Sequence, residues 1–175
     1  MIWFWLGICT FGAICGELLS ARVGGDIPLV AITTFYFVVL LGWRRPLFCG
    51  LGAAVLLDLF LMRSVPITVL LVPMAAVLAL FWRRHGDCKT PGVQALPGAI
   101  LGGATGTAVV LCLIVPFESF TWAFVLHCAW VWGSTLLLGV ISAPLWIAAL
   151  DHSAARLELP CFRDIQEHLD PSRHN

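Results

Sequence analysis

The chain has 175 residues, of which 60% are hydrophobic and only 11% are charged. A soluble domain carries about 25% charged residues, so this chain could not cover its surface in water. Ten basic residues balance ten acidic ones, which leaves no basic field for nucleic-acid phosphates. The composition disfavours a soluble enzyme, a disordered tail and a nucleic-acid binder, and it predicts an integral membrane protein.

Continuous apolar stretches between clusters of charge predict six membrane-spanning helices, because lipid offers the backbone no hydrogen-bond partners. About 20 residues cross the hydrocarbon core, so the second, third and fourth stretches are short, and Pro144 is expected to kink or end the long sixth one. The first is retained as a helix rather than a signal peptide, because no basic residue precedes it. In chain order the expected spans are Ile2–Ser20, Ile27–Gly42, Pro46–Met62, Val65–Trp82, Leu96–Val115 and Phe120–Ile147.

The basic residues predict the orientation of these spans. If the N-terminus is cytoplasmic, the inner loops hold eight basic residues and the outer loops hold only Arg22 and Arg63. Cytoplasmic loops carry the excess of Lys and Arg, so we expect both termini inside. Residues 1–150 would then form one transmembrane domain and residues 151–175 a short cytoplasmic tail. The expected cytoplasmic basic anchors are Arg44, Arg45, Arg83 and Arg84.

The tail offers one local pattern. Pro160 could open a short helix with Phe162, Ile165 and Leu169 on one face. Such a helix suits the inner leaflet or a cytosolic partner, and a frayed tail is an equal alternative.

Asp58 is the most informative single residue, because a carboxylate inside a span costs about 2.5–3.5 kcal/mol. It must face the bundle interior with a partner or be protonated. An interhelical hydrogen bond is the interpretation we favour, and an ion site, a substrate site or a contact with another protein is the alternative. The candidate partners are Thr33, Thr34 and Thr68. Three further acidic residues, Glu17, Asp26 and Glu118, fall near the outer face and are too scattered to indicate a site.

His127 lies in the sixth span beside Cys128, but neighbouring residues on a helix point about 100° apart, so these two do not form a catalytic dyad. We expect a packed, hydrogen-bonded histidine. The seven cysteines include no C-x-x-C pair and suit small hydrophobic positions. His85-Gly-Asp-Cys88 is a weak metal signal, so we expect neither a metal nor a cofactor.

Glycines recur at four-residue spacing in two spans. Gly98-x-x-x-Gly102-x-x-x-Gly106 lies in the fifth span, and Gly12-x-x-x-Gly16 lies in the first. Small residues at this spacing let helix backbones approach closely. The two interpretations are packing within the bundle, which we favour, and docking of a partner's transmembrane helix.

The order of several short motifs resembles the MreD family, the small polytopic subunit of the bacterial rod-shape machinery. The resemblance covers roughly Pro28 to Arg156. Its motifs are Pro28 at the start of the second span, the Arg44-Arg45 turn, a Gly-rich third span ending in Leu56-Leu57-Asp58-Leu59, a hydrophobic hairpin to Arg83-Arg84, and a last span closing with Ser142-Ala143-Pro144-Leu145.

This resemblance implies a non-enzymatic scaffold in the bacterial inner membrane. The implied partners are membrane lipid, an MreC-like single-span protein, MreB filaments, a RodA-like glycosyltransferase and a class B penicillin-binding transpeptidase. It also implies an all-helical fold similar to the substrate-binding subunits of energy-coupling-factor transporters. Two alternatives stay open: a transporter subunit that binds a small molecule, and a small membrane enzyme that uses Asp58 or His127.

Overall fold

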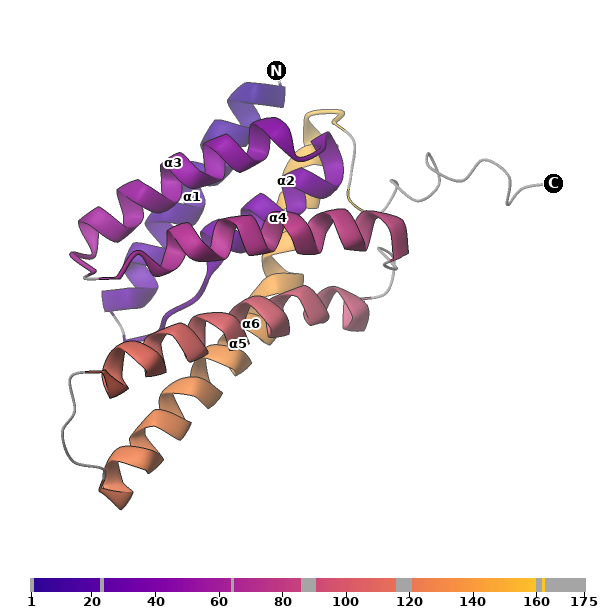
Figure 1. The fold of residues 1–175 in the computed structure, drawn as a ribbon. Coiled ribbons are helices and arrows are strands. Elements are labelled where there is room, and N and C mark those ends of the chain that lie inside the picture. Colours follow the sequence, from indigo (N-terminus) through magenta and orange to yellow (C-terminus); the bar gives the residue numbers. More distant parts are fainter. Residues whose placement is uncertain are drawn as a thin grey trace.

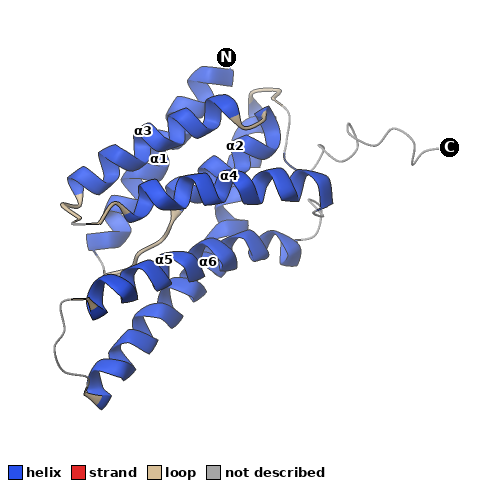
Figure 2. Cartoon of the chain, in the orientation of Figure 1, coloured by secondary structure: helices blue, strands red, loops and turns tan. Residues whose placement is uncertain are grey.

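A computed structural model describes residues 2–22, 24–63, 65–85, 91–115, 121–159 and 162. Every regular element within these residues is a helix, as the composition predicted (Figures 1 and 2). The helices are α1 (Ile2–Arg22), α2 (Leu29–Leu41), α3 (Arg44–Phe60), α4 (Ile67–His85), α5 (Pro91–Ile114) and α6 (Trp122–Arg156).

Four of these helices, α1, α4, α5 and α6, are long and apolar enough to cross a membrane. Helix α2 is also apolar, but its 13 residues rise only about 20 Å. The lengths and the apolar composition are those of a membrane protein. The count of six spans stays a prediction.

Helix α2 forms the centre of the molecule. Eleven of its 13 residues are buried, and it packs against all five other helices. A helix that is apolar on every side is stable only when it is surrounded, so this sequence suits the central position. The helix follows Pro28 and is capped at its C-terminus by Gly42, whose φ of 83° glycine adopts without strain.

Helices α1 to α4 pack around this centre, while α5 and α6 form a long hairpin. The C-terminal half of α6 passes behind α2 and α4, and its N-terminal half diverges from them together with α5 (Figure 1). Helix α6 continues through Pro144 to Arg156, so the expected end of this span at Ile147 is wrong. A proline removes one backbone hydrogen bond, and the buried contacts of Ala143 and Ile147 on either side hold the helix.

The connection between α4 and α5 is shorter than expected. Helix α4 continues to His85, and α5 begins at Pro91 rather than at Leu96. Proline is favoured in the first turn of a helix, where its missing N–H is not needed, so the sequence carried this start signal inside the expected loop.

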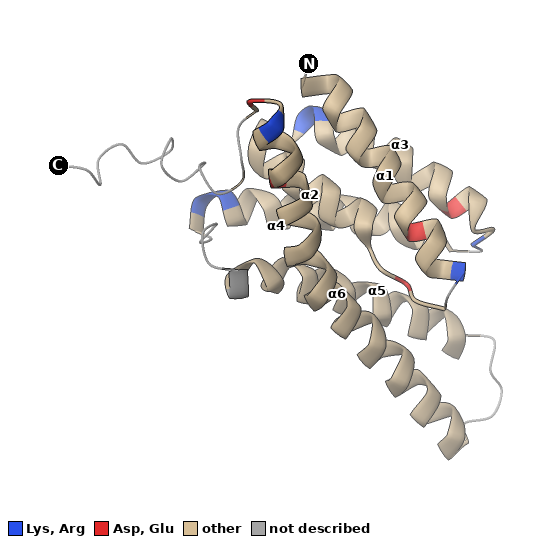
Figure 3. Ribbon diagram, turned by 180° about the vertical axis from the view of Figure 1, so that it is seen from behind, with Lys and Arg blue, Asp and Glu red and all other residues tan. Residues whose placement is uncertain are grey.

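Most charged residues lie toward the two ends of the molecule (Figure 3). Five arginines mark one end, which we term the basic end, and Arg22 and Arg63 lie at the opposite end. Apolar helices separate the two groups, as expected for a protein whose middle lies in lipid. The basic end holds Arg44, Arg45, Arg83, Arg84 and Arg156.

The C-terminal end of α6 is fixed to the core by polar contacts. Asp151 accepts hydrogen bonds from the Tyr36 hydroxyl at 2.7 Å and from the Phe162 backbone N–H at 2.8 Å. Phe162 is fully buried and stacks on Tyr36. Phe162 therefore packs within this chain, which fits neither a membrane-facing or partner-facing position nor a frayed one for this residue. Pro160, Ile165 and Leu169 lie outside the described residues.

The glycines of α5 bring its backbone into contact with α6. A Cβ added at Gly102 would lie 2.7 Å from the carbonyl oxygen of Thr135 and 3.1 Å from the Cα of Gly139. Gly98 meets the Gly139 carbonyl even more closely, and Gly106 meets the Thr135 side chain. The Gly98, Gly102 and Gly106 stripe thus lies inside the molecule, against α6.

This contact predicts that an alanine destabilises the protein at Gly102 but not at the neighbouring Gly103. Gly102→Ala forces the two helix backbones apart and should destabilise the protein by about 1–3 kcal/mol, the usual cost of overpacking. The matched control is Gly103→Ala, whose new Cβ would meet only a flexible leucine side chain at 3.7 Å. Thermal unfolding in detergent should show a lower Tm for Gly102→Ala alone, and equal Tm values would contradict the contact.

Candidate functional site

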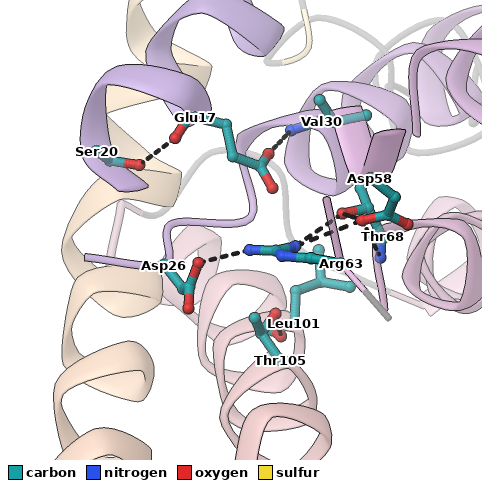
Figure 4. A network of polar contacts seen from close by, with 9 residues as sticks. All are labelled: Glu17, Ser20, Asp26, Val30, Asp58, Arg63, Thr68, Leu101 and Thr105. Atoms are coloured by element: carbon teal, nitrogen blue, oxygen red, sulfur yellow. Dashed lines mark hydrogen bonds and ion pairs between the residues drawn. The ribbon is translucent and has the colours of Figure 1, made fainter. Parts of the chain in front are cut away.

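The buried carboxylate of Asp58 bonds to the start of the next helix. Its side chain, on α3, is only 6% exposed. Oδ1 accepts from the Thr68 hydroxyl at 2.8 Å and from the Thr68 backbone N–H at 3.3 Å (Figure 4). Oδ2 accepts from the Val69 N–H at 3.1 Å. Thr68 and Val69 lie in the first turn of α4, whose N–H groups have no partner within the helix.

Asp58 therefore caps α4 from the neighbouring helix. A carboxylate at a helix N-terminus satisfies the free N–H groups and interacts favourably with the helix dipole. Thr68 is one of the three hydrogen-bond partners considered from the sequence. The hydroxyls of the other two, Thr33 and Thr34, donate to carbonyl oxygens one turn earlier in α2.

Arg63 extends this contact into a cluster at the end opposite the basic end. Its Nη1 lies 3.5 Å from Asp58 Oδ1 and donates to the Thr68 hydroxyl at 3.1 Å. Its Nη2 donates to Asp26 Oδ1 at 2.6 Å, which ties in the segment between α1 and α2 (Figure 4). The three residues Asp26, Asp58 and Arg63 form an ion-pair chain that joins the two hairpins α1–α2 and α3–α4.

Glu17 repeats the arrangement of Asp58 on the other hairpin. This α1 residue is 4% exposed, and its Oε2 accepts from the Val30 N–H at 3.0 Å, in the first turn of α2 (Figure 4). The interpretation of Glu17 and Asp26 as scattered charges is therefore wrong, because both lie at this end and Asp26 bonds to Arg63. Glu118 lies outside the described residues. We term Glu17, Asp26, Asp58, Arg63 and Thr68 the capping cluster.

Sequence reasoning overlooked Arg63, which appeared only as a loop charge. A usable signal was present, since Arg63 is one of only two basic residues expected at that end, where three carboxylates were also expected. At the margin of an apolar layer an unpaired charge is costly, so an arginine and nearby carboxylates are expected to form hydrogen-bonded ion pairs.

The capping cluster holds helix ends together, and its carboxylate oxygens bond to backbone N–H groups and to Arg63. Within the part of the chain that the structure describes, no three His, Cys, Asp or Glu side chains are arranged to hold a metal ion. The His85–Cys88 segment falls mostly on residues 86–90, which the structure does not describe.

His127 differs from its expected environment. The residue is exposed on the N-terminal half of α6, where Cys128 faces inward and is buried. The prediction of a packed, hydrogen-bonded His127 is wrong, because the hairpin diverges from the bundle here and leaves this side of α6 uncovered. His127 lies on α6 remote in sequence from the capping cluster and bonds to none of its members.

The second glycine pair also lies at contacts within the molecule. A Cβ on Gly12 would be 4.0 Å from the Trp146 ring of α6, and a Cβ on Gly16 would be 2.7 Å from a Leu29 methyl group of α2. The basic anchors Arg44, Arg45, Arg83 and Arg84 lie at the basic end, away from the capping cluster.

Removing the cap should destabilise the protein. Asp58→Ala leaves one buried and one partly buried backbone N–H group of α4 without an acceptor, at a cost of about 1–3 kcal/mol in the free energy of unfolding. Asp58→Asn retains one acceptor oxygen and should lose less. Thermal unfolding in detergent measures both, and an Asp58→Ala protein as stable as the wild type would refute the capping role.

Removing the Arg63 guanidinium should weaken the attachment between the α1–α2 and α3–α4 hairpins. Arg63→Gln leaves Asp26 and Asp58 without their shared partner, and we expect a loss of about 1–3 kcal/mol. Arg22→Gln is the matched control, because Arg22 is exposed at the same end. Similar Tm values for the two variants would show that Arg63 contributes only surface charge.

Comparison of the chain with protein-family models, with curated proteins and with solved structures gives no match.

Proposed function

We propose that this protein is a multi-pass scaffold of the bacterial inner membrane, with six spans and both termini in the cytoplasm. The separation of charge supports this topology. Five described arginines lie at the basic end and two at the opposite end, and the cytoplasmic side of a membrane protein carries the excess. The short helix α2 crosses as part of the surrounded core rather than against lipid.

A scaffold role is supported chiefly by the hydrogen bonds of the buried polar groups, which join helices of this chain to one another. Glu17 and Asp58 cap helices, and the Thr33 hydroxyl accepts from the Trp146 indole at 2.8 Å, which joins α2 to α6. Groups that bond to the helices of their own bundle favour a structural role over turnover of a substrate.

The α5–α6 hairpin offers the surface for a partner. Its N-terminal α6 half carries large exposed apolar side chains, including Trp122 at 76%, Leu126 at 56% and Trp130 at 75% exposure. This side faces away from α1 to α4 and is open to lipid or to another transmembrane helix. With the MreD resemblance of the sequence, these features favour an MreC-like single-span partner.

Through such a partner the protein would link MreB filaments to the peptidoglycan synthases, a RodA-like glycosyltransferase and a class B penicillin-binding transpeptidase. The transporter alternative rests on the expected similarity to energy-coupling-factor subunits. It predicts saturable binding of a small molecule by the purified protein.

Depletion and co-purification test this proposal. Depleting the protein from a rod-shaped host should give rounded cells, and an MreC-like protein should co-purify from membranes. Trp130→Ala should reduce that recovery by about fivefold to tenfold. A tryptophan that becomes buried at a protein–protein interface commonly contributes a large part of the binding free energy. Phe48→Ala on α3, which removes a side chain of 71% exposure, is the control.

Unchanged cell shape after depletion would refute the scaffold role. Saturable binding of a metabolite, measured as a thermal shift, would instead support the transporter alternative.

A further inference from the structure

The basic end contains an open pocket of about 460 Å³ between the start of α1 and the turn that joins α2 to α3. Ligand pockets commonly measure about 300–1,000 Å³, so this one has room for a small polar group. It is lined by Trp3, Leu41, Gly42, Trp43, Arg44 and Arg45.

Aromatic rings hold the guanidinium groups at this pocket. The Arg45 guanidinium lies 4.4 Å from the centre of the Trp3 ring, and that of Arg44 lies 5.8 Å from the centre of Trp43. Arg83 of α4 reaches the same turn, since its Nη1 lies 3.8 Å from where a Cβ on Gly42 would be. Contact with the rings fixes the positions of the Arg44 and Arg45 guanidinium groups but leaves their charge uncompensated.

No carboxylate within the described part of the chain forms an ion pair with these three arginines, because both ion pairs found there belong to Arg63 at the opposite end. Helix α3 also begins at this pocket, with no acidic residue in its first turn and no side-chain cap from Trp43. Its dipole adds positive potential to that of the guanidinium groups. The pocket is therefore built for an anion.

The surroundings indicate that this anion is attached to hydrocarbon. Trp3 and Trp43 are 45% and 48% exposed, and Phe4 and Phe48, near the starts of α1 and α3, are 75% and 71% exposed. Tryptophan gathers where lipid headgroups meet hydrocarbon, and arginine binds phosphate through paired N–H groups.

We propose that this pocket binds the phosphate group of an anionic phospholipid such as phosphatidylglycerol. The acyl chains would lie along the exposed aromatic side chains, and the headgroup phosphate would lie between Arg44, Arg45 and Arg83. The inference requires only that the basic end lies at a membrane surface, and it is independent of the protein partners proposed above.

Native mass spectrometry of the full chain in detergent tests the site. Short-chain phosphatidylglycerol should bind, whereas phosphatidylcholine and inorganic phosphate at the same concentration should not. Arg45→Gln should weaken phosphatidylglycerol binding about fivefold, which corresponds to about 1 kcal/mol per basic residue at a membrane surface. Arg84→Gln, the matched control, removes the same charge at the basic end from a residue that does not line the pocket.

Trp3→Ala separates a built site from diffuse surface charge. It removes no charge but releases the Arg45 guanidinium, so it should also weaken binding. Equal losses in Arg45→Gln and Arg84→Gln, or no loss in Trp3→Ala, would overturn the proposal. Inorganic phosphate that binds as well as the lipid would overturn the assignment to lipid. Tm values without added lipid verify that all three variants are folded.

Discussion

The backbone N–H groups at the start of a helix need acceptors, and inside an apolar layer water does not supply them. This constraint governs the bundle. Glu17 and Asp58 each reach from one helix to the first turn of the next. Glu17 accepts a hydrogen bond from one backbone N–H there, and Asp58 accepts from two. Burying a carboxylate costs free energy. That cost is offset because the carboxylate bonds to peptide N–H groups that would otherwise be buried without a partner.

These caps make the short central helix possible. Helix α2 rises only about 20 Å, and the side chain of Glu17 supplies an acceptor to its first turn from within the protein. Arg63 then connects the α3–α4 hairpin to the segment before α2 through Asp26. The ends of three helices are thus fixed relative to one another by side chains rather than by the loops.

The sequence was sufficient to predict the six helices and their approximate positions, because each is marked by a long apolar run and by charges at its ends. It also placed Thr68 among the partners of Asp58, since few polar groups were available at that depth. The contact between Arg63 and Asp26 was not predictable, because it depends on how two connecting segments lie in space. The continuation of α6 past Pro144 and the burial of Phe162 were missed for the same reason: tertiary packing outweighs the local signals of proline and of an amphipathic tail.

The length of α6 has a consequence for the depth of its ends. Its 35 residues rise about 52 Å, whereas a helix tilted by the average of about 20° needs only about 32 Å to traverse the hydrocarbon. Immersing the whole rod would need an inclination of about 55°, beyond the range of about 0–40° that such helices adopt. A crossing by α6 within that range therefore leaves at least one end of the helix beyond the hydrocarbon, in the hydrated headgroup layer.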